Sequence, residues 1–526
     1  MPAWLKDAVF YEIYPQSFYD SNGDGIGDIN GIIEKQDYVR GLGCNALWIN
    51  PCFDSPFKDG GYDVRDYKKV APRYGTNDDL VRLFREAHER GMRVLLDLVP
   101  GHTSEEHEWF RQSSKAEPNE YSGRYVWTRN WIEPATGFAY IAGESERAGA
   151  YLLNFFKCQP ALNYGFLRVD QGWQMPVDHP ECLATREAIK DVMRFWMDLG
   201  CDGYRVDMAG SLVKNDDAEQ SGTAAIWRDV REMMDEEYPQ CALVAEWGRP
   251  TVSLKAGFHM DFYLDRPGNG YSTLMRDWGN HEDGADHSYF KKDGGGSIRR
   301  FLDEYVAWYE ATRGDGYISL ITCNHDTIRA RRTLSPRELA LAYAFLFTMP
   351  GVPFLYYGDE IGMRYLELPT KDGGYVRTGS RTPMQWGGGK NRGFSTAPEQ
   401  ELYLPADPAD DAPTVEAAEA DPNSLLHVVR ALIALRHAHE DLQADAHFEP
   451  LVTADSKPFV YRRGGLVLAV NPSGRECGAS QQDALPGAAL PQDAEAIFAL
   501  GGGGALRGGV LVMEPQSFVV MEERRA

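Results

Sequence analysis

Strand-like apolar runs alternate with helical patterns along most of the chain, and this alternation constrains the fold more than any other feature. Strands that alternate with helices form parallel sheets, because each connection must cross back over the sheet. Eight such units are typical of a closed (β/α)8 barrel, so we expect an α/β fold of the TIM-barrel class. The predicted strands are residues 7–15, 45–51, 93–99, 200–209, 242–247, 258–265, 317–326 and 352–360.

Helices are predicted between the strands wherever apolar residues recur at helical spacing. One such pattern, over residues 29–42, is interrupted by Gln36. The pattern over residues 424–442 supplies the helix of the eighth unit, so we expect the barrel to run through residue 443. The other predicted helices span residues 75–91, 185–199, 227–238 and 336–349.

Two further parts interrupt or follow the barrel, since 526 residues are too many for a single core. Residues 103–178 are rich in Trp, Tyr, Asn, Gly and Pro, show no clear helix, and are too long for an ordinary loop. We predict an inserted subdomain there (domain B), within a barrel formed by residues 1–102 and 179–443 (domain A). Residues 444–526 contain short apolar runs broken by Gly, Pro and Asp, which predicts a C-terminal antiparallel β domain, a β-sandwich (domain C). The glycine-rich residues 371–395 are expected to form a long loop over the barrel mouth.

The charge balance is strongly acidic, because 78 Asp and Glu outnumber 54 Lys and Arg and give a formal net charge of −24. This balance argues against nucleic acid or an anionic membrane as a partner and suits a neutral substrate or a bound cation. No apolar run approaches the length of a membrane span. The eight cysteines are scattered without a CxxC pair, and the first residues do not resemble a signal peptide. We therefore expect reduced thiols in a cytoplasmic protein.

A short polar segment, residues 20–28, has the composition of a cation-binding loop. Oxygen-bearing side chains recur at even spacing and glycines allow a tight turn, which is the arrangement that calcium prefers. The candidate ligands are Asp20, Asn22, Asp24, the carbonyl of Ile26, and Asp28. The segment is not an EF-hand, because Gly31 stands at the twelfth position and no helix precedes it. A plain polar turn is the alternative interpretation.

The end of the fourth predicted strand carries Arg205 and Asp207, with Val206 between them. Because side chains alternate along a strand, the arginine and the carboxylate share one face. A neighbouring guanidinium favours the ionised carboxylate, which is the state that a nucleophile requires. Taken alone, the pair is equally consistent with a structural ion pair that caps the strand.

Polar residues also end other predicted strands: Asp97 and then His102 follow the third, Glu246 ends the fifth, and His325 and Asp326 end the seventh. The carboxyl ends of all strands of such a barrel face one mouth, where active sites lie. The sequence contains neither a transition-metal ligand spacing nor a glycine-rich phosphate loop after a strand, so carboxylates must supply the chemistry. Two carboxylates in a cleft are typical of glycoside hydrolysis. The apolar residues before Glu246 favour a raised pKa and hence a proton donor.

Several segments carry a more specific signal: Asp97-Leu-Val-Pro-Gly-His102, Gly203-Tyr-Arg-Val-Asp207, Ala245-Glu246-Trp247, Asn324-His-Asp326, Gly61-Tyr-Asp-Val64 and Arg381-Thr-Pro-Met-Gln-Trp386. With these segments the chain resembles the α-amylase family, glycoside hydrolase family 13. It is most similar to the branch that contains oligo-1,6-glucosidases, α-glucosidases, sucrose isomerases and trehalose synthases. The resemblance covers roughly residues 5–440 in order.

The resemblance implies a role for each matching position. Asp207 would be the nucleophile, Glu246 the general acid/base, and Asp326 the residue that grips ring hydroxyls and stabilises the transition state. The residues that would bind the same sugar are Asp59, Tyr62, His102, Arg205 and His325. The loop at residues 20–28 would hold a structural calcium ion, and no organic cofactor is expected.

The leading interpretation is a retaining α-glycoside hydrolase that cleaves α-glucosidic bonds of malto-oligosaccharides or other starch-derived oligosaccharides through a covalent glycosyl-aspartate. A transglycosylase or isomerase acting on sucrose, maltose or trehalose would share the first half-reaction. A non-catalytic carbohydrate-binding barrel is disfavoured because all three carboxylates are present. Met208, next to the nucleophile, fits neither the Val of 1,6-specific relatives nor the Ala or Thr of 1,4-specific ones, so the linkage preference stays open.

Overall fold

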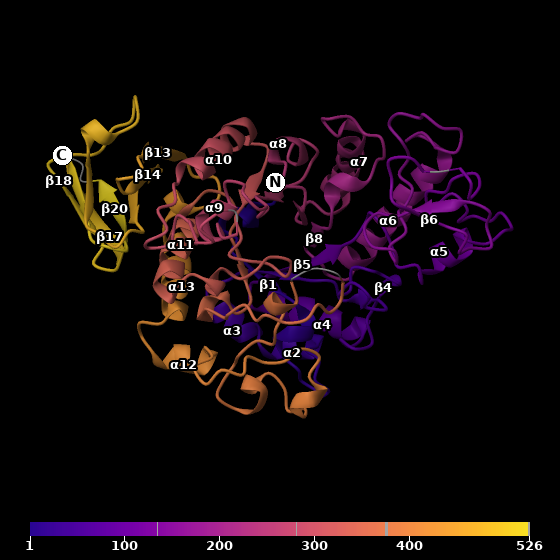
Figure 1. The fold of residues 1–526 in the computed structure, drawn as a ribbon, viewed down its shortest axis with the longest axis horizontal. Coiled ribbons are helices and arrows are strands. Elements are labelled where there is room, and N and C mark those ends of the chain that lie inside the picture. Colours follow the sequence, from indigo (N-terminus) through magenta and orange to yellow (C-terminus); the bar gives the residue numbers. More distant parts are fainter. Residues whose placement is uncertain (134, 280, 374–376, 524–526) are drawn as a thin grey trace.

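Eight parallel strands close into a barrel in the computed structural model. The barrel lies between the C-terminal strands and the segment that carries α5 (Glu108–Ser113) and β6 (Tyr140–Ala142), as Figure 1 shows. Neighbouring strands follow the order β11-β10-β9-β8-β5-β2-β1-β12, and the hydrogen bond from Phe354 N to Leu320 O, at 3.0 Å, closes the ring. The strands are β1 (Phe10–Ile13), β2 (Ala46–Ile49), β5 (Arg93–Leu98), β8 (Gly203–Val206), β9 (Ala242–Ala245), β10 (Met260–Phe262), β11 (Tyr317–Ser319) and β12 (Phe354–Tyr356). The predicted (β/α)8 barrel is confirmed, and each predicted strand contains one of these eight.

The structure describes residues 1–133, 135–279, 281–373 and 377–523. The predicted inserted subdomain, mouth loop and C-terminal domain each include positions outside these ranges, and they are described without those positions. Within the described ranges, no helix combines the length and the apolar character needed to cross a lipid bilayer.

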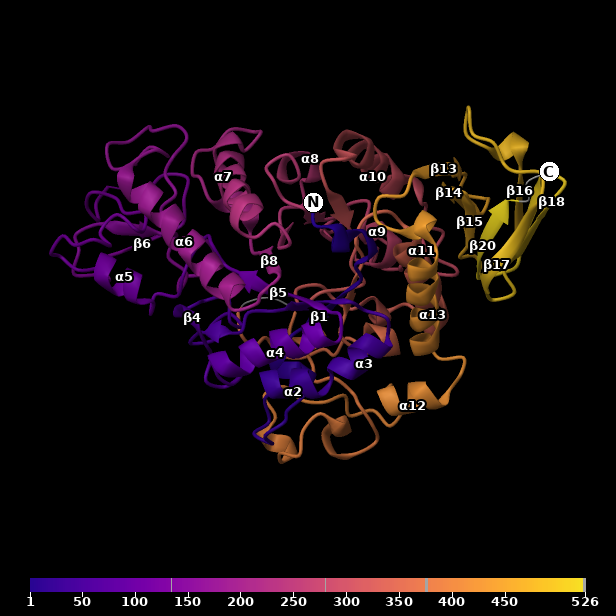
Figure 2. The ribbon, with the colours of Figure 1, turned by 180° about the vertical axis from the view of Figure 1, so that it is seen from behind.

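The barrel strands are apolar because they are covered on both faces. Every residue of β1, β2, β8 and β9 is buried, as expected for parallel strands that lie between a packed interior and an outer layer of helices. Inside the barrel, the ring of Phe10 stacks on Phe354 with centroids 4.3 Å apart, and Trp48 packs on Phe262 at 5.5 Å. The interior is therefore a filled core, and the helices in Figures 1 and 2 surround it.

Most predicted helices are present with shifted ends. The pattern over residues 29–42 forms two helices instead of one, α2 (Ile29–Glu34) and α3 (Gln36–Gly41), which meet at Lys35. At the junction Lys35 leaves helical geometry, with φ −102° and ψ 3°, and the buried Gln36 that begins the second helix donates through Nε2 to Leu83 O at 3.2 Å. The other main barrel helices are α4 (Asn77–Glu89), α6 (Pro180–Asp198), α7 (Ser221–Glu237), α10 (Arg299–Thr312), α11 (Pro336–Thr348) and α13 (Leu425–Ala438), of which α10 was not predicted.

The inserted segment after β5 contains more regular structure than its sequence suggests. A short helix, α5 (Glu108–Ser113), and a two-stranded antiparallel sheet of β6 (Tyr140–Ala142) and β7 (Ala150–Leu152) lie there. The expectation of no clear helix is therefore wrong for α5, which is too short to show a helical period. Aromatic side chains of this segment pack against one another, and the rings of Phe110 and Trp127 stack with their centroids 5.9 Å apart.

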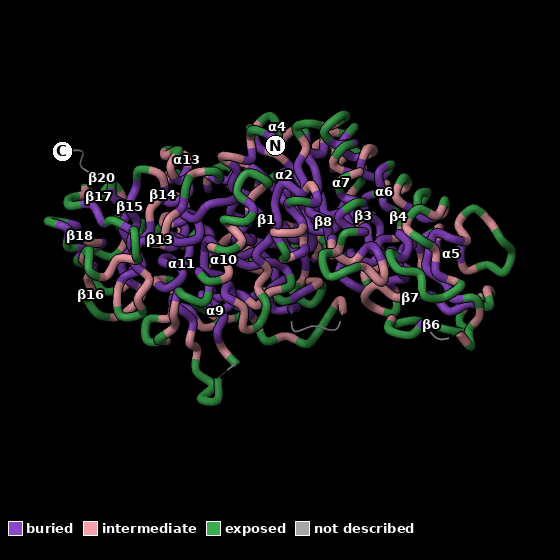
Figure 3. The backbone as a smooth tube through the Cα atoms, turned by 90° about the horizontal axis from the view of Figure 1, so that it is seen from above, coloured by how far each residue is buried: buried purple, intermediate pink, exposed green. Residues whose placement is uncertain are grey.

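The C-terminal part is an antiparallel β domain, as predicted. One eight-stranded sheet has the order β13-β14-β15-β20-β17-β18-β19-β16. Its strands are β13 (Phe448–Val452), β14 (Phe459–Arg463), β15 (Leu466–Asn471), β16 (Cys477–Ser480), β17 (Ala494–Leu500), β18 (Gly504–Arg507), β19 (Val510–Met513) and β20 (Ser517–Glu523). It has an apolar core of its own, which includes Leu451, Val467 and Leu511. Figure 3 shows buried residues along the barrel and in this domain, with exposed residues mainly in the outer loops. The predicted domain boundaries and the sandwich arrangement stay predictions.

Candidate active site

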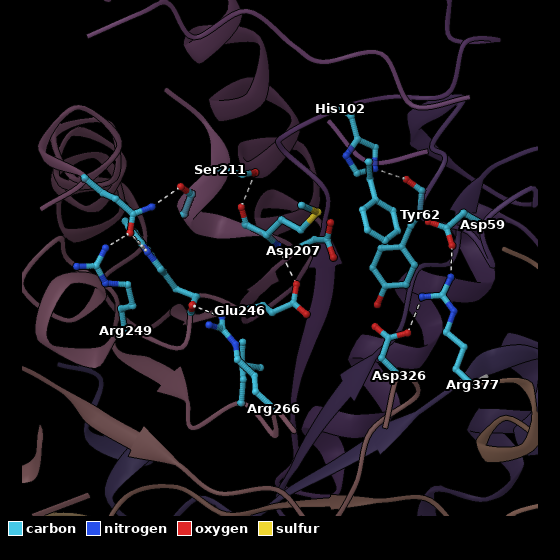
Figure 4. Close-up of a pocket in the computed structure, with 16 residues that line it drawn as sticks. Asp59, Tyr62, His102, Asp207, Ser211, Glu246, Arg249, Arg266, Asp326 and Arg377 are labelled. Carbon is cyan, nitrogen blue, oxygen red and sulfur yellow. Dashed lines mark hydrogen bonds and ion pairs between the residues drawn. The ribbon is translucent and has the colours of Figure 1, made fainter. Parts of the chain in front are cut away.

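The carboxyl ends of the barrel strands surround one cavity of about 420 Å³. Its wall contains the three predicted catalytic carboxylates, Asp207, Glu246 and Asp326. In Figure 4, Asp207 and Glu246 lie in the middle of the view, with Asp326 to one side. The other lining residues are Asp59, Tyr62, His102, Phe155, Met208, Gly210, Ser211, Gln220, Trp247, Arg249, Leu264, Arg266 and Arg377.

Arg205 lies directly beneath the cavity and connects three carboxylates. Its Nη1 is 2.7 Å from Asp97 Oδ1 and 2.9 Å from Asp207 Oδ1, and its Nη2 is 3.0 Å from Glu246 Oε2. The sheet order explains this convergence, because β8 lies between β5, which carries Asp97, and β9, which Glu246 follows. The planar guanidinium therefore fixes Asp207 and Glu246 relative to each other.

Asp207 and Asp97, two buried carboxylates beside Arg205, both have raised pKa values. Burial raises the pKa of Asp207 well above its usual range; Arg205 lowers it, and the carboxylates of Glu246 and Asp97 raise it again. Burial also raises the pKa of Asp97, against the effect of Arg205. The expectation that Arg205 alone keeps Asp207 ionised is therefore incomplete. Three carboxylates around one guanidinium favour retention of a proton within the cluster.

Glu246 is held by the backbone as well as by Arg205. The N–H of Met208 donates to Glu246 Oε2 at 2.9 Å. This contact accompanies a left-handed backbone at Met208, with φ 44° and ψ 43°, which is uncommon for a residue other than glycine. Backbone strain of this kind persists where the surrounding contacts fix it. At Met208 it directs a hydrogen-bond donor at the carboxylate.

An ion-pair network lines the cavity on the side of Asp326. Arg377 pairs with Asp59, and its Nη1 is 2.7 Å from Asp326 Oδ1. Arg381 Nη2 lies 2.7 Å from the same oxygen. Gln159 Nε2 donates to the second carboxylate oxygen of Asp59 at 2.7 Å. Figure 4 shows Asp59, Arg377 and Asp326 together on this side, opposite Arg249 and Arg266.

His325 connects Asp326 to buried groups beneath the cavity. Its Nε2 lies 3.2 Å from Asp326 Oδ2 and 2.5 Å from Tyr62 Oη, and its Nδ1 lies 2.9 Å from Glu12 Oε1. Although burial opposes the charged form, Asp326 and Glu12 raise the pKa of His325 to about 9. Against the effect of burial, His325 and two arginines hold the pKa of Asp326 well below its usual range. At neutral pH, His325 is therefore a cation and Asp326 an anion.

The pKa of His102 is lowered, whereas that of His325 is raised. Burial lowers the pKa of His102 to about 3, so the ring is neutral at neutral pH. Its Nε2 lies 3.2 Å from the carbonyl of Tyr62, which can only accept, and Asn154 Nδ2 donates to Nδ1 at 3.1 Å. These two partners select one tautomer and one orientation of the ring at the cavity wall.

All eight predicted catalytic and substrate-binding residues converge on this cavity. Six of them line it, whereas Arg205 and His325 support it from beneath. Glu12 and Arg377 were missed. Glu12 had a detectable signal, because it is a charged residue inside an apolar, aromatic strand. Arg377 had none, since it lies in a long irregular loop whose path depends on tertiary contacts. The role of each residue stays a prediction.

The predicted calcium loop lies apart from the cavity, and none of its residues lines the wall. Asp20 Oδ1 accepts from the N–H of Gly23 at 2.7 Å, and Ser395 Oγ donates to Asp20 Oδ2 at 2.5 Å. Asp28 caps α2 by accepting from the N–H of Gly31 at 2.7 Å. Across the described ranges, no three Asp, Glu, His or Cys side chains gather as a metal-binding group. The polar-turn interpretation accounts for these contacts, and calcium stays a prediction.

Known proteins are similar to this chain over the whole barrel. A family model of the α-amylase catalytic domain matches residues 12–445. The chain belongs to the α-amylase family. Within this α-amylase family, a trehalose synthase/amylase from Mycolicibacterium smegmatis is 35% identical over an alignment of 483 positions that covers 83% of this chain and 77% of that protein. An oligo-1,6-glucosidase from Parageobacillus thermoglucosidasius is 31% identical over an alignment of 527 positions that covers 87% of each protein.

Solved structures of similar proteins share the complete architecture of this α-amylase family member. An α-glucosyl transfer enzyme, XgtA, matches with a TM-score of 0.81 and 27% identity over 100% of both chains. A mutant of the trehalulose synthase MutB matches with a TM-score of 0.79 and 25% identity over 99% of both chains. The resemblance to the α-amylase family and to its oligo-1,6-glucosidase and trehalose synthase branch is confirmed. The protein is a glycoside hydrolase enzyme of that family.

Proposed function

We propose that the protein is a retaining α-glucosidase-type hydrolase that removes a terminal glucosyl unit from short α-glucosidic oligosaccharides. One observation carries the proposal: Asp207 and Glu246 share one guanidinium within a cavity that the Asp59–Arg377 pair closes on the side of Asp326. Two carboxylates held close together suit the covalent, retaining mechanism, for which they lie about 5–5.5 Å apart.

In the reactive state the proton retained by the Arg205 cluster lies on Glu246, which leaves Asp207 ionised beside the guanidinium. In the first half-reaction, Asp207 attacks the anomeric carbon, and the bond from that carbon to the glycosidic oxygen breaks. Glu246 gives its proton to the departing oxygen through Oε1, since Arg205 and Met208 both contact Oε2. The anionic Asp326 stabilises the positive charge that develops on the ring. In the second half-reaction, water attacks the same carbon and gives a proton to Glu246, Asp207 departs, and the α-anomer is released.

The size and closure of the cavity favour short substrates bound end first. A volume of about 420 Å³ lies in the lower part of the range for small-molecule sites, roughly 300–1,000 Å³. The Asp59–Arg377 pair stands where a longer chain would otherwise continue beyond the terminal sugar. Beside it, the ring of Tyr62 stacks on His325 with centroids 5.3 Å apart and offers a flat face to the sugar. The leaving group then points toward Arg249 and Arg266.

Transfer of the glucosyl unit to a second sugar is the other candidate function. The trehalose synthase/amylase relative and the neighbouring structures of α-glucosyl transfer and trehalulose synthase enzymes favour it. It keeps the glycosyl-Asp207 intermediate and replaces water by a sugar hydroxyl. Sucrose, maltose and trehalose are the substrates to test.

Product analysis tests the proposal. Maltose, isomaltose, maltotriose, sucrose, trehalose and soluble starch are incubated with the enzyme and followed by NMR from the first turnover. We expect α-glucose as the first product from at least one disaccharide, and slower attack on starch. A β-anomer as the first product contradicts retention, and internal cleavage of starch contradicts the closed end. A new disaccharide with little free glucose selects transfer.

Two further features belong to the proposal. The loop at residues 20–28 binds a calcium ion with a structural role, because its oxygen-rich sequence remains suited to that cation. The protein works in the cytoplasm, a location supported by eight cysteines that are all free thiols.

A further inference from the structure

Two arginines at the leaving-group side of the cavity have no acidic partner. Arg249 and Arg266 both line the wall, and neither forms an ion pair with any carboxylate in the described part of the chain. The other arginines around the site are neutralised: Arg205 contacts three carboxylates, and Arg377 contacts Asp59 and Asp326. Both side chains are exposed to solvent at the cavity, so their charges are open to a ligand that enters it.

Arg249 is held in place by uncharged groups. Its Nη1 donates to Gln220 Oε1 at 2.8 Å and its Nη2 donates to the carbonyl of Ala218 at 3.0 Å. Gln220 also accepts from Trp247 Nε1 at 2.7 Å and donates through Nε2 to the carbonyl of Gly210 at 2.7 Å. The side chain of Gln220 therefore connects the segments after β8 and β9, and orients a guanidinium without cancelling its charge.

Arg266 contacts the segment that follows β9, at Trp247 and Gly248. Its Nη2 donates to the carbonyl of Trp247 at 3.4 Å, and this nitrogen lies against Gly248, where an added Cβ atom would be 3.3 Å from it. Arg249 directly follows Gly248 in the chain. Figure 4 shows the two arginines on the side of the cavity away from Asp59 and Asp326. A leaving group that departs toward this side meets both cations.

We propose that the leaving group of the natural substrate carries an anionic substituent, a phosphate or a carboxylate, that binds Arg249 and Arg266. A guanidinium presents several N–H donors in a planar fork that matches both anions, and such charge-assisted contacts are stronger than those to neutral hydroxyls. Each arginine keeps N–H groups that are not used by its protein partners. This inference rests on the proposed function, which places the terminal sugar at Asp59 and the leaving group opposite.

Three ligands that differ only at carbon 6 of one sugar ring test the inference: glucose, glucuronate and glucose 6-phosphate. Binding to the wild-type protein is measured by calorimetry, and inhibition is measured against a neutral α-glucoside. We expect one or both anionic ligands to bind at least tenfold more tightly than glucose, and the comparison between them distinguishes carboxylate from phosphate. Arg249→Ala or Arg266→Ala should weaken the preferred anion about 10- to 150-fold and leave glucose binding within about threefold.

Arg507→Ala serves as the matched control, because Arg507 is an exposed arginine on the C-terminal domain, away from the cavity. Thermal unfolding of each variant confirms that it is folded. Glucose that binds as tightly as both anionic ligands overturns the inference, as does an anion preference that survives both cavity substitutions. Failure of the proposed function is distinguished by a different result: the enzyme turns over no α-glucoside. The calorimetric comparison of glucose with the anionic ligands can still be made in that case.

Discussion

Replacing Arg377 by alanine removes its ion pairs to Asp59 and Asp326 at the cavity wall. Asp326 then keeps Arg381 and His325 as charged partners. Asp59 loses its ion pair and keeps the hydrogen bond from Gln159 Nε2 at 2.7 Å. The substitution therefore acts mainly on Asp59.

The magnitude follows from burial. The side chains of Arg377 and Asp59 are 6% and 3% exposed, so solvent screens their interaction little. Removing one member of a buried pair costs about 3–5 kcal/mol when the other member stays charged. Asp59 can escape part of this cost by binding a proton, because burial already raises its pKa against the effect of Arg377. The cost then depends on pH.

Proton binding determines whether the stability lost in Arg377→Ala rises or falls with pH. A folded state that binds more protons than the unfolded state loses stability as pH rises. The destabilisation by Arg377→Ala is therefore small below about pH 4, the pKa of Asp in an unfolded chain, and grows until Asp59 itself ionises in the folded variant. Thermal unfolding across this pH range measures the effect.

The double variant with Asp59→Asn is the control. Because it removes the unpaired carboxylate, it should recover most of the stability that Arg377→Ala loses at higher pH. The value of kcat/KM for the best disaccharide should fall about 10- to 150-fold in Arg377→Ala, since hydrogen bonds to charged groups contribute about 1.5–3 kcal/mol. A loss of stability that is independent of pH, or one that Asp59→Asn fails to relieve, would refute this reasoning.

Three further predictions concern other parts of the molecule. Glu246→Gln should lower kcat about 10²- to 10⁴-fold for substrates with poor leaving groups and much less for aryl glucosides; equal losses for both classes would contradict its role as the acid. Glu12→Gln should move the pKa of His325 down from about 9, followed by NMR of labelled histidine, whereas Glu360→Gln, at a buried carboxylate bonded to two tyrosines, should leave that titration unchanged. Calcium at 100 times its Kd should stabilise the protein by about 2.7 kcal/mol, an effect that Asp24→Ala removes; a wild-type Tm that responds to neither calcium nor EDTA would favour the polar turn.

The barrel and most of its site were accessible from sequence because strand ends carry a local signal. Arg205 lies on β8 and Asp207 directly follows the strand, and the parallel order of β5, β8 and β9 then brings Asp97 and Glu246 to the same guanidinium. Once the eight strands are recognised, their polar ends must meet. No knowledge of side-chain contacts is needed for that step.

The parts that were missed depend on contacts between segments distant in sequence. Arg377 reaches Asp59 across a separation of 318 residues, and nothing near either residue in the chain indicates the pairing. Gln36, which interrupts the apolar pattern over residues 29–42, is buried with a hydrogen bond to the carbonyl of Leu83, 47 residues away. The protonation of Asp207 likewise depends on how many carboxylates gather around Arg205, which the sequence alone does not count.

Trapping the glycosyl-enzyme tests the central claim most directly. The enzyme is incubated with a 5-fluoro-α-glucosyl fluoride, which forms the covalent intermediate faster than it is hydrolysed, and the labelled peptide is identified by mass spectrometry. We predict a single fluoroglucosyl adduct on Asp207, in wild-type protein and not in Asp207→Asn. An adduct on another residue, or turnover of the reagent through a pathway that Asp207→Asn leaves intact, would contradict the account.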